Sequence, residues 1–547
     1  MEKTRKSLSE KTSRLVEELY RPRTFMAFLT ADTEKIPCIE EIGRCGEPAA
    51  IPYLVAFAIV SRQEVAEASA RAIERLSSSL TPAQYVQFDQ YARIHSSDVL
   101  PGWQAWYKIR AKDIHRLSKL GDAGAVIIGL ATCHWNGYVR EEAVKELGRM
   151  KAGMELPFLL MRVNDWVRPV RELARRLLRE RVRLEYGAHF LRWLPLVVRL
   201  RRVHRWDQSE LIEAIDEMIS LPEAVSFLVP GCESDDSAVR QFCFEQLYDR
   251  HGGDKETLIN KVLADAEPMI RRMGTRFLES ASEGPRLIEW LEQSSRDRSP
   301  RIRAEAQRIY FERFPDRAAG LLQGALLDVN ARVREQAQFF AEKQGSRSLR
   351  AFYLETLSRG DSNEVCAAIA GLGEKGSRTD AVLVSQYLRG DQSRIRAAAL
   401  RSLAKLDFEH HVDDFVKALK DESRSVAREA RAVLARKPNS AGGERLWRVF
   451  QEHIGSRGKR DVLFLLARLT RWESLGYLLQ ALGDGDDEVS ALSGRYLRRL
   501  DQRWNRSFTV PTAEQVVWLN KILDTHGLLV SETAVSTYRK LVNESGR

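Results

Sequence analysis

Apolar side chains recur along most of this chain at the three- and four-residue spacing of amphipathic helices, and short polar segments separate one stripe from the next. One stripe runs from Ala318 to Leu326, and a second runs from Val333 to Ala341. Between them lie Asp328 and Asn330, whose side-chain oxygens suit the free amides of a first helical turn. The pattern predicts two helices joined by a tight acidic turn.

This two-helix unit repeats, because a Val-Arg or Ile-Arg pair returns near the start of each second helix. Where neighbouring copies follow directly, the arginines are 31, 31, 32 and 31 residues apart, and one interval of 62 spans two copies. A period of this length is typical of a solenoid. The arginines of this structural repeat ladder are Arg140, Arg171, Arg240, Arg271, Arg303, Arg334 and Arg396.

An aspartate precedes the arginine by six residues in several copies, at Asp165, Asp265, Asp297 and Asp328. We expect each arginine to pair with the aspartate of its own or the adjacent turn, which would fix the stacking of one unit on the next. The functional alternative is that the same arginines present positive charge to a ligand in the groove of the solenoid.

Helix-turn-helix units with this signature resemble HEAT repeats, particularly the short HEAT-like kind named from phycobilisome lyases. The resemblance covers about residues 46–500 and implies an all-α fold, an α-solenoid in which antiparallel helix pairs form a superhelix with the second helices on the concave side. We expect an irregular N-terminal cap over 1–45, irregular insertions in the array near 78–120 and 181–215, and capping helices over 501–547.

The first insertion is rich in aromatic residues interleaved with Lys108, Arg110 and Lys112. Such residues form either a stacking platform for bases or a hot-spot patch for a protein, or else the large core of an irregular helix pair. The residues of this secondary aromatic patch are Tyr85, Trp103, Trp106 and Tyr107.

Most of the net charge of the chain lies in the predicted helix before the second insertion and in the first part of that insertion. Between residues 168 and 206 there are twelve arginines and three glutamates, a net charge of +9, whereas the whole chain has +10. Guanidinium groups beside aromatic rings suit phosphates or carboxylates, although acidic residues brought close by folding could neutralise them instead. The predicted contact residues for an anionic ligand or acidic protein are Arg175, Arg179, Arg183, Arg192, Arg199, Arg201, Arg202, Arg205, Trp193 and Trp206.

Known catalytic patterns are missing from the sequence, which has no P-loop, GxGxxG, HExxH or GxSxG motif. The ten histidines are dispersed, so neither a cofactor nor a metal is predicted. Six cysteines without a CxxC pair indicate buried reduced thiols and a cytoplasmic protein. No apolar run reaches the roughly 18 residues of a membrane span.

These observations predict a monomeric, non-enzymatic interaction scaffold that binds an acidic protein through its Arg-rich region. The main alternative is a nucleic-acid-binding solenoid. Two enzyme classes with similar repeats are less favoured alternatives, namely phycobilin lyases and HEAT-like alkylpurine DNA glycosylases. The pair Asp165-Trp166 is compatible with the glycosylases.

Overall fold

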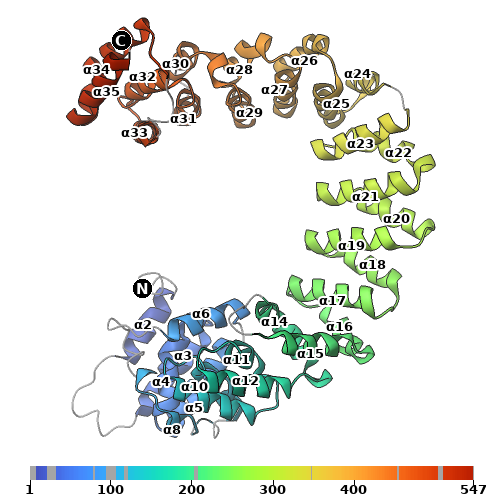
Figure 1. Cartoon of the computed structure of the whole chain (residues 1–547), viewed down its shortest axis with the longest axis vertical. Helices are drawn as coiled ribbons and strands as arrows, with labels where there is room; N and C mark the ends of the chain where they lie inside the picture. Colours follow the sequence, from blue (N-terminus) through green and yellow to red (C-terminus); the bar gives the residue numbers. More distant parts are fainter. Residues whose placement is uncertain are drawn as a thin grey trace. The chain divides into compact units, whose positions relative to one another are not determined.

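The computed structural model describes residues 8–20, 32–77, 80–93, 106–115, 117, 121–201, 207–345, 348–452, 455–502 and 509–545. Every regular element among these residues is a helix, so the predicted all-α fold is confirmed (Figure 1). The chain divides into two compact units, Met1–Phe277 and Leu278–Arg547. Consecutive helices pack as antiparallel pairs of the HEAT type, and the boundary between the units lies within the predicted repeat array.

The first unit holds the irregular part of the array. Its helices, given in chain order, are α2 (Glu10–Leu19), α3 (Ile36–Arg44), α4 (Ile51–Val60), α5 (Gln63–Ser77), α6 (Pro82–Ala92), α8 (Ala111–Ile114), α9 (Gly121–Ala131), α10 (Gly137–Gly148), α11 (Leu156–Arg162), α12 (Arg168–Arg179), α13 (Gly187–Arg192), α14 (Leu194–Leu200), α15 (Ser209–Ser220), α16 (Val225–Gly231), α17 (Ser237–Arg250), α18 (Lys255–Ala264) and most of α19 (Pro268–Ser280).

The second unit is more regular. Its helices are α20 (Pro285–Ser294), α21 (Pro300–Arg313), α22 (Ala319–Leu326), α23 (Ala331–Lys343), α24 (Leu349–Arg359), α25 (Ser362–Lys375), α26 (Ala381–Gln386), α27 (Ser393–Leu406), α28 (Val412–Ala418), α29 (Arg424–Leu434), α30 (Gly443–Gln451), α31 (Gly455–Leu466), α32 (Arg471–Ala481), α33 (Asp487–Gln502), α34 (Ala513–His526) and α35 (Glu532–Ser545).

The turn between α22 and α23 forms as its residues predict. The Asp328 carboxylate accepts a hydrogen bond from the amide of Asn330 at 2.8 Å, and the Asn330 side chain accepts one from the amide of Arg332 at 3.0 Å. Helix α23 then buries Val333 and Phe340 against the core. Capping of the first-turn amides therefore fixes where the second helix of the repeat begins.

The arginine ladder is confirmed, and its pairing is with the adjacent turn. Arg240, Arg303 and Arg396 each make a two-point contact with an aspartate 25 residues downstream, at distances between 2.7 and 2.9 Å. Each also donates to the carbonyl six residues upstream, in its own turn, at 2.8 Å. One guanidinium thus joins two successive turns and sets the register of neighbouring repeats.

Two members of the ladder depart from this register. Arg334 pairs with Glu374, 40 residues downstream, where no aspartate stands at the usual place. Arg171 donates to the Asp165 carbonyl at 2.9 Å, but residue 196, which lies 25 positions further on, is a leucine. The second departure coincides with the insertion at 181–215, where the regular period is lost.

The first insertion supplies a helix, α6, that packs against helices far from it in the sequence. Tyr85 of α6 makes edge contacts with Phe158 of α11 and with Trp193 at the start of α14, in both cases with ring centroids 5.3 Å apart. Helix α6 therefore lies beside α11 and α14, helices that follow it by more than sixty residues. This contact creates the cavity described below.

Among the described residues, no helix is long and apolar enough to cross a membrane. All six cysteines are free thiols, and Cys133, Cys232 and Cys243 are buried. Burial raises the pKa of the Cys232 thiol to about 11 and that of Cys243 to about 12, so both are protonated at neutral pH.

Candidate functional site in the Arg-rich region

The predicted contact arginines are spread over three helices and a connecting segment of the first unit. Arg175 and Arg179 lie on α12, Arg192 ends α13 and Arg199 lies on α14. Arg183 and Arg201 follow α12 and α14. All six are exposed except Arg175, which is half-buried. The predicted residues Arg202, Arg205 and Trp206 lie outside the described residues.

Folding neutralises part of this charge. Arg179 pairs with Glu210, and Arg201 contacts Asp216 at 2.5 Å; both acids belong to α15. Arg181 is buried and contacts the Glu155 carboxylate at 2.6 Å. Within the described residues, a second group of arginines makes no ion pair: Arg175, Arg176, Arg183, Arg192 and Arg199.

Exposed apolar side chains accompany these unpaired arginines. Val198 precedes Arg199 on α14 and is 37% exposed, while Val225 and Val229 on α16 are 37% and 47% exposed. Helix α13, which carries Arg192, contacts both α14 and α16. The face formed by α13, α14 and α16 therefore combines guanidinium groups with accessible aliphatic surface.

Three of the predicted aromatic contacts are wrong, because they are core residues. Tyr85, Trp106 and Trp193 are 5%, 2% and 8% exposed, and Trp106 donates its indole hydrogen to the Ala92 carbonyl at 3.3 Å. Tyr85 and Trp193 fill the junction of α6 with α11 and α14, and Trp106 packs between α6 and His134, so none of the three is accessible to a base or a partner. Tyr107 is half-buried and packs on Trp135, and Trp103 lies outside the described residues.

Among the described residues of this unit, the large aromatic side chains that are exposed lie instead in two consecutive turns. Trp135 and Trp166 occupy equivalent positions, 31 residues apart, and are 38% and 65% exposed; Tyr138 beside the first is 78% exposed. The period itself could have revealed this pair, because the same turn position carries tryptophan twice in succession but Ala266, Arg298 and Val329 in later copies.

The turn that bears Trp166 contains a buried cluster of charge. The Asp165 carboxylate, which is fully buried, accepts from Arg140 at 2.9 and 3.0 Å, from Arg162 at 3.1 Å and from Arg93 at 3.1 Å. It also accepts from the amide of Val167 at 2.9 Å. Its two oxygens are thus engaged by three guanidinium groups and one backbone amide.

A second carboxylate shares two of these arginines. Asp89 on α6 contacts Arg93 at 2.9 Å and Arg162 at 2.6 Å. The cluster thus contains three arginines, counting Arg140, and two aspartates, so it carries a net charge of +1 with Arg162 only 1% exposed. The Arg162 Nε has no hydrogen-bond partner among the described residues. Such an excess of buried charge is costly unless a counter-charge approaches.

This cluster forms the floor of a cavity of about 410 Å³ between α6, α11, the Asp165 turn and α14. Trp166 and Asn164 line it from the turn, and Arg199 lines it from α14. The cavity residues are Asp89, Gln90, Arg93, Leu160, Met161, Arg162, Asn164, Trp166, Leu196, Arg199 and Leu200. Of the predicted contact residues, only Arg199 is among them.

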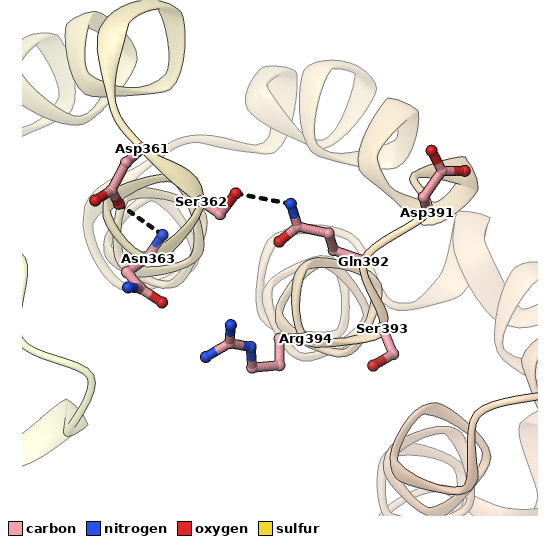
Figure 2. A pocket seen from close by; sticks show the side chains of 7 residues that line it. All are labelled: Asp361, Ser362, Asn363, Asp391, Gln392, Ser393 and Arg394. Atoms are coloured by element: carbon pink, nitrogen blue, oxygen red, sulfur yellow. Dashed lines mark hydrogen bonds between the residues drawn. The ribbon is translucent and has the colours of Figure 1, made fainter.

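The second unit also contains a polar hollow, at the N-termini of α25 and α27 (Figure 2). There the Asp361 carboxylate accepts from the amides of Asn363 and Glu364 at 2.8 and 2.9 Å, which caps α25, and the Gln392 side chain donates to Ser362 Oγ at 2.7 Å. These polar groups serve the helix ends and the join between repeats. Nothing there gathers charge as the Asp165 turn does.

Chemistry based on a metal or a reactive thiol has no clear location in the described part of the chain. No group of three or more histidine, cysteine or acidic side chains there could hold a metal ion. The His410 and His411 imidazoles, adjacent in sequence, contact different carboxylates, those of Asp407 and Asp414.

Comparison with known proteins gives fold likenesses only. No family model matches the chain, and no curated protein matches it. Among solved structures it is similar to Kap95p bound to RanGDP, at 12% identity and a TM-score of 0.35 over 85% of this chain and 66% of that one. It is also similar to the S. pombe condensin Cnd3–Cnd2 subcomplex, at 12% identity and a TM-score of 0.33 over 97% and 82% of the two chains. At such low identity these likenesses say nothing of what this chain binds.

Proposed function

We propose that this protein is a non-enzymatic interaction scaffold that binds an acidic protein segment through the unpaired arginines in and after α12, on α13 and on α14, together with the exposed valines of α14 and α16. The observation that supports the proposal is that five arginines of the Arg-rich region make no ion pair within the described residues. In the second unit, by contrast, many exposed cations pair with an acid one repeat away, such as Arg378 with Asp407 and Lys420 with Glu452.

A protein partner is favoured over nucleic acid because of the aliphatic side chains on the same face. Val198, Val225 and Val229 are accessible beside Arg192 and Arg199. Protein interfaces combine arginine with apolar surface, whereas nucleic-acid interfaces are more polar and more strongly charged. Asp165 offers no free carboxylate for base chemistry, since its oxygens already accept from three arginines.

The experiment measures fluorescence anisotropy of a labelled oligoglutamate-rich peptide that also carries leucine residues, titrated with the intact protein. One variant combines Arg175→Glu, Arg176→Glu and Arg183→Glu. Its matched control combines Arg296→Glu, Arg332→Glu and Arg424→Glu, three exposed arginines of the second unit that make no ion pair within the described residues. Each variant lowers the formal net charge from +10 to +4.

We expect the first variant to weaken peptide binding by at least about tenfold and the control to change it by less than about twofold, because attraction between charges acts locally at physiological salt. Equal losses in both variants would show that only the overall charge matters and would contradict the proposal. Duplex DNA serves as the competing ligand. If it bound more tightly than the peptide, with a log-log salt slope near −4.5 for about five phosphates, the protein would be a nucleic-acid binder.

A further inference from the structure

The cavity beside Trp166 is built for a ligand with negative charge. Of the charged cluster, Asp89, Arg93 and Arg162 line the cavity with a net charge of +1, and Arg199 on α14 adds a guanidinium that makes no ion pair within the described residues. The Arg162 Nε, on a side chain that is 1% exposed, also lacks a partner. An anionic group at this position would gain charge-assisted hydrogen bonds and offset the excess positive charge.

The Trp166 indole gives the same cavity an aromatic wall. The guanidinium carbon of Arg140 lies over this ring at 6.0 Å from its centroid, and Arg140 itself is fully buried. One face of the indole is therefore held against the protein, while the side chain remains 65% exposed. A ring fixed in this way at the edge of a cavity suits a planar ligand that stacks on it.

The third element of the cavity is the side-chain amide of Asn164. Its Oδ1 is buried without a hydrogen-bond partner, and the amide makes no other hydrogen bond among the described residues. A primary amide both donates and accepts, so it matches the paired donor and acceptor on the edge of a heteroaromatic base. A simple phenyl ring would leave this buried amide without a partner, at a cost in free energy.

From these three elements we infer that the cavity binds a nucleotide, with the base stacked on Trp166 and hydrogen-bonded to Asn164 and the phosphate held by Arg199 beside Arg93 and Arg162. The volume of about 410 Å³ falls within the range of small-molecule sites. This inference shares Arg199 with the proposed protein interface, whereas the contacts with Trp166 and Asn164 belong to the cavity alone. The same chemistry can come from a free nucleotide or from one nucleotide of a single strand.

The experiment is isothermal titration calorimetry of the intact protein with AMP, ribose 5-phosphate, inorganic phosphate and a short oligoadenylate. We expect saturable binding of AMP with a dissociation constant below about 1 mM, at least about tenfold tighter than ribose 5-phosphate, because one base–aromatic stack supplies a factor of that order. Oligoadenylate binding at least about tenfold tighter than AMP would identify a strand as the source of the nucleotide. Equal affinities would identify the free nucleotide.

The decisive variant is Trp166→Ala, and its matched control is Trp135→Ala at the equivalent position of the preceding turn. Trp166→Ala should lower the affinity for AMP to that for ribose 5-phosphate and leave the latter unchanged, while Trp135→Ala should change neither. Because Trp166 is exposed, the variant is expected to keep the thermal unfolding midpoint of the parent. Asn164→Ala should reduce AMP binding several-fold, again without affecting ribose 5-phosphate.

Several results would overturn the inference. AMP binding no tighter than that of inorganic phosphate would show a site for anions alone. Equal losses in the Trp135 and Trp166 variants would place the ligand elsewhere. A peptide with a C-terminal phenylalanine carboxylate is the competing ligand, since it also joins a ring to an anion. If it bound more tightly than AMP and were lost in Trp166→Ala, the cavity would be a peptide site.

Discussion

The turn at Asp165 in the first unit and the turn at Asp421 in the second have the same place in the repeat but different surroundings. Asp421 accepts a two-point contact from one arginine, Arg396, at 2.8 and 2.9 Å. Asp165 accepts the equivalent contact from Arg140 and, in addition, contacts from Arg93 and Arg162. The Asp421 turn is a joint between repeats, whereas the Asp165 turn is part of a charged cluster beside a cavity.

The difference arises from one inserted helix. Arg93 and Asp89 come from the segment of α6, which has no counterpart in the regular repeat, and they reach the Asp165 turn from 72 and 76 residues upstream. Arg162 pairs with Asp89 and Asp165 together. A solenoid can therefore gain a charged cavity at an ordinary turn when an irregular helix packs over that turn.

The largest expected effect separates the two aspartates. Asp165→Asn removes the charge that three arginines share and should destabilise the surrounding helices by about 3–5 kcal/mol, the usual cost of breaking a buried ion pair. Asp421→Asn weakens one partly buried contact and should cost about 1–2 kcal/mol. Hydrogen exchange of α10–α12 and of α27–α29 measures the two losses separately. Equal losses would contradict the distinction between the turns.

A second prediction concerns the turn preceding Asp165, where His134 stands at the aspartate position. Its Nδ1 accepts from the amide of Asn136 at 3.1 Å, as Asp165 accepts from the amide of Val167, and its Nε2 donates to the Trp106 carbonyl at 2.9 Å. Only the neutral ring can make both contacts. Burial lowers the pKa of His134 to about 4.

Because this pKa is lower in the folded protein than the value of about 6.5 in the unfolded chain, the unfolded state binds the proton first. The stability that the neutral ring contributes is present above pH about 6.5 and is lost as the pH falls toward 4, with a limit of about 3 kcal/mol. Hydrogen exchange of the α10 amides should therefore become faster as the pH falls over this range, once the pH dependence of the intrinsic exchange rate has been corrected for. His134→Asn keeps an acceptor for the Asn136 amide and should abolish the pH dependence; its persistence would assign the effect to another group.

A smaller loss of stability is expected from a change in the regular arginine ladder. Arg396→Lys retains one contact with Asp421 but loses the second arm of the fork and the bonds to the carbonyls of Gly390 and Asp391, so it should cost about 1 kcal/mol. Arg424→Lys at a neighbouring exposed position is the control and should change stability by less than about 0.5 kcal/mol. Hydrogen exchange in α27 and α29 measures the loss of stability in both variants. No loss in the first variant would mean that charge alone joins the repeats.

The smallest expected change in stability belongs to Arg93→Met. This substitution lowers the net charge of the cluster from +1 to zero and leaves Arg140 and Arg162 paired, so it should alter the free energy of unfolding by less than about 1 kcal/mol. It should nevertheless weaken AMP binding several-fold, because the phosphate loses a neighbouring cation. A destabilisation as large as that of Asp165→Asn would show that Arg93 is a structural member of the turn.

The regular parts of this molecule could be read from the sequence because their contacts have a fixed separation along the chain. The pairing of Arg240 or Arg303 with the next turn follows from the 31-residue period and the acidic residue within it. The irregular junction could not be read in this way. Tyr85 and Trp193 pack together across 108 residues, so whether their rings were core or surface depended on where α6 lies.

The candidate site was found only in part for the same reason. The excess of arginine predicted a binding region, and Arg199 lies at the cavity. Asp89 and Arg93 belong to the other insertion, and no sequence signal connects them with Asp165. Asn164 belongs to no recognisable sequence motif. Only the structure singles it out, because its side-chain Oδ1 is buried without a hydrogen-bond partner. Charge can be counted from a sequence, but neutralisation by distant residues requires the fold.

Hydrogen exchange of the intact protein with and without the acidic peptide tests the central claim most directly, since it locates binding along the chain without any substitution. The account predicts slower exchange in α12, α13, α14 and α16 of the first unit and no change in α25, α27 and α29 of the second. Protection confined to those three helices of the second unit would contradict it.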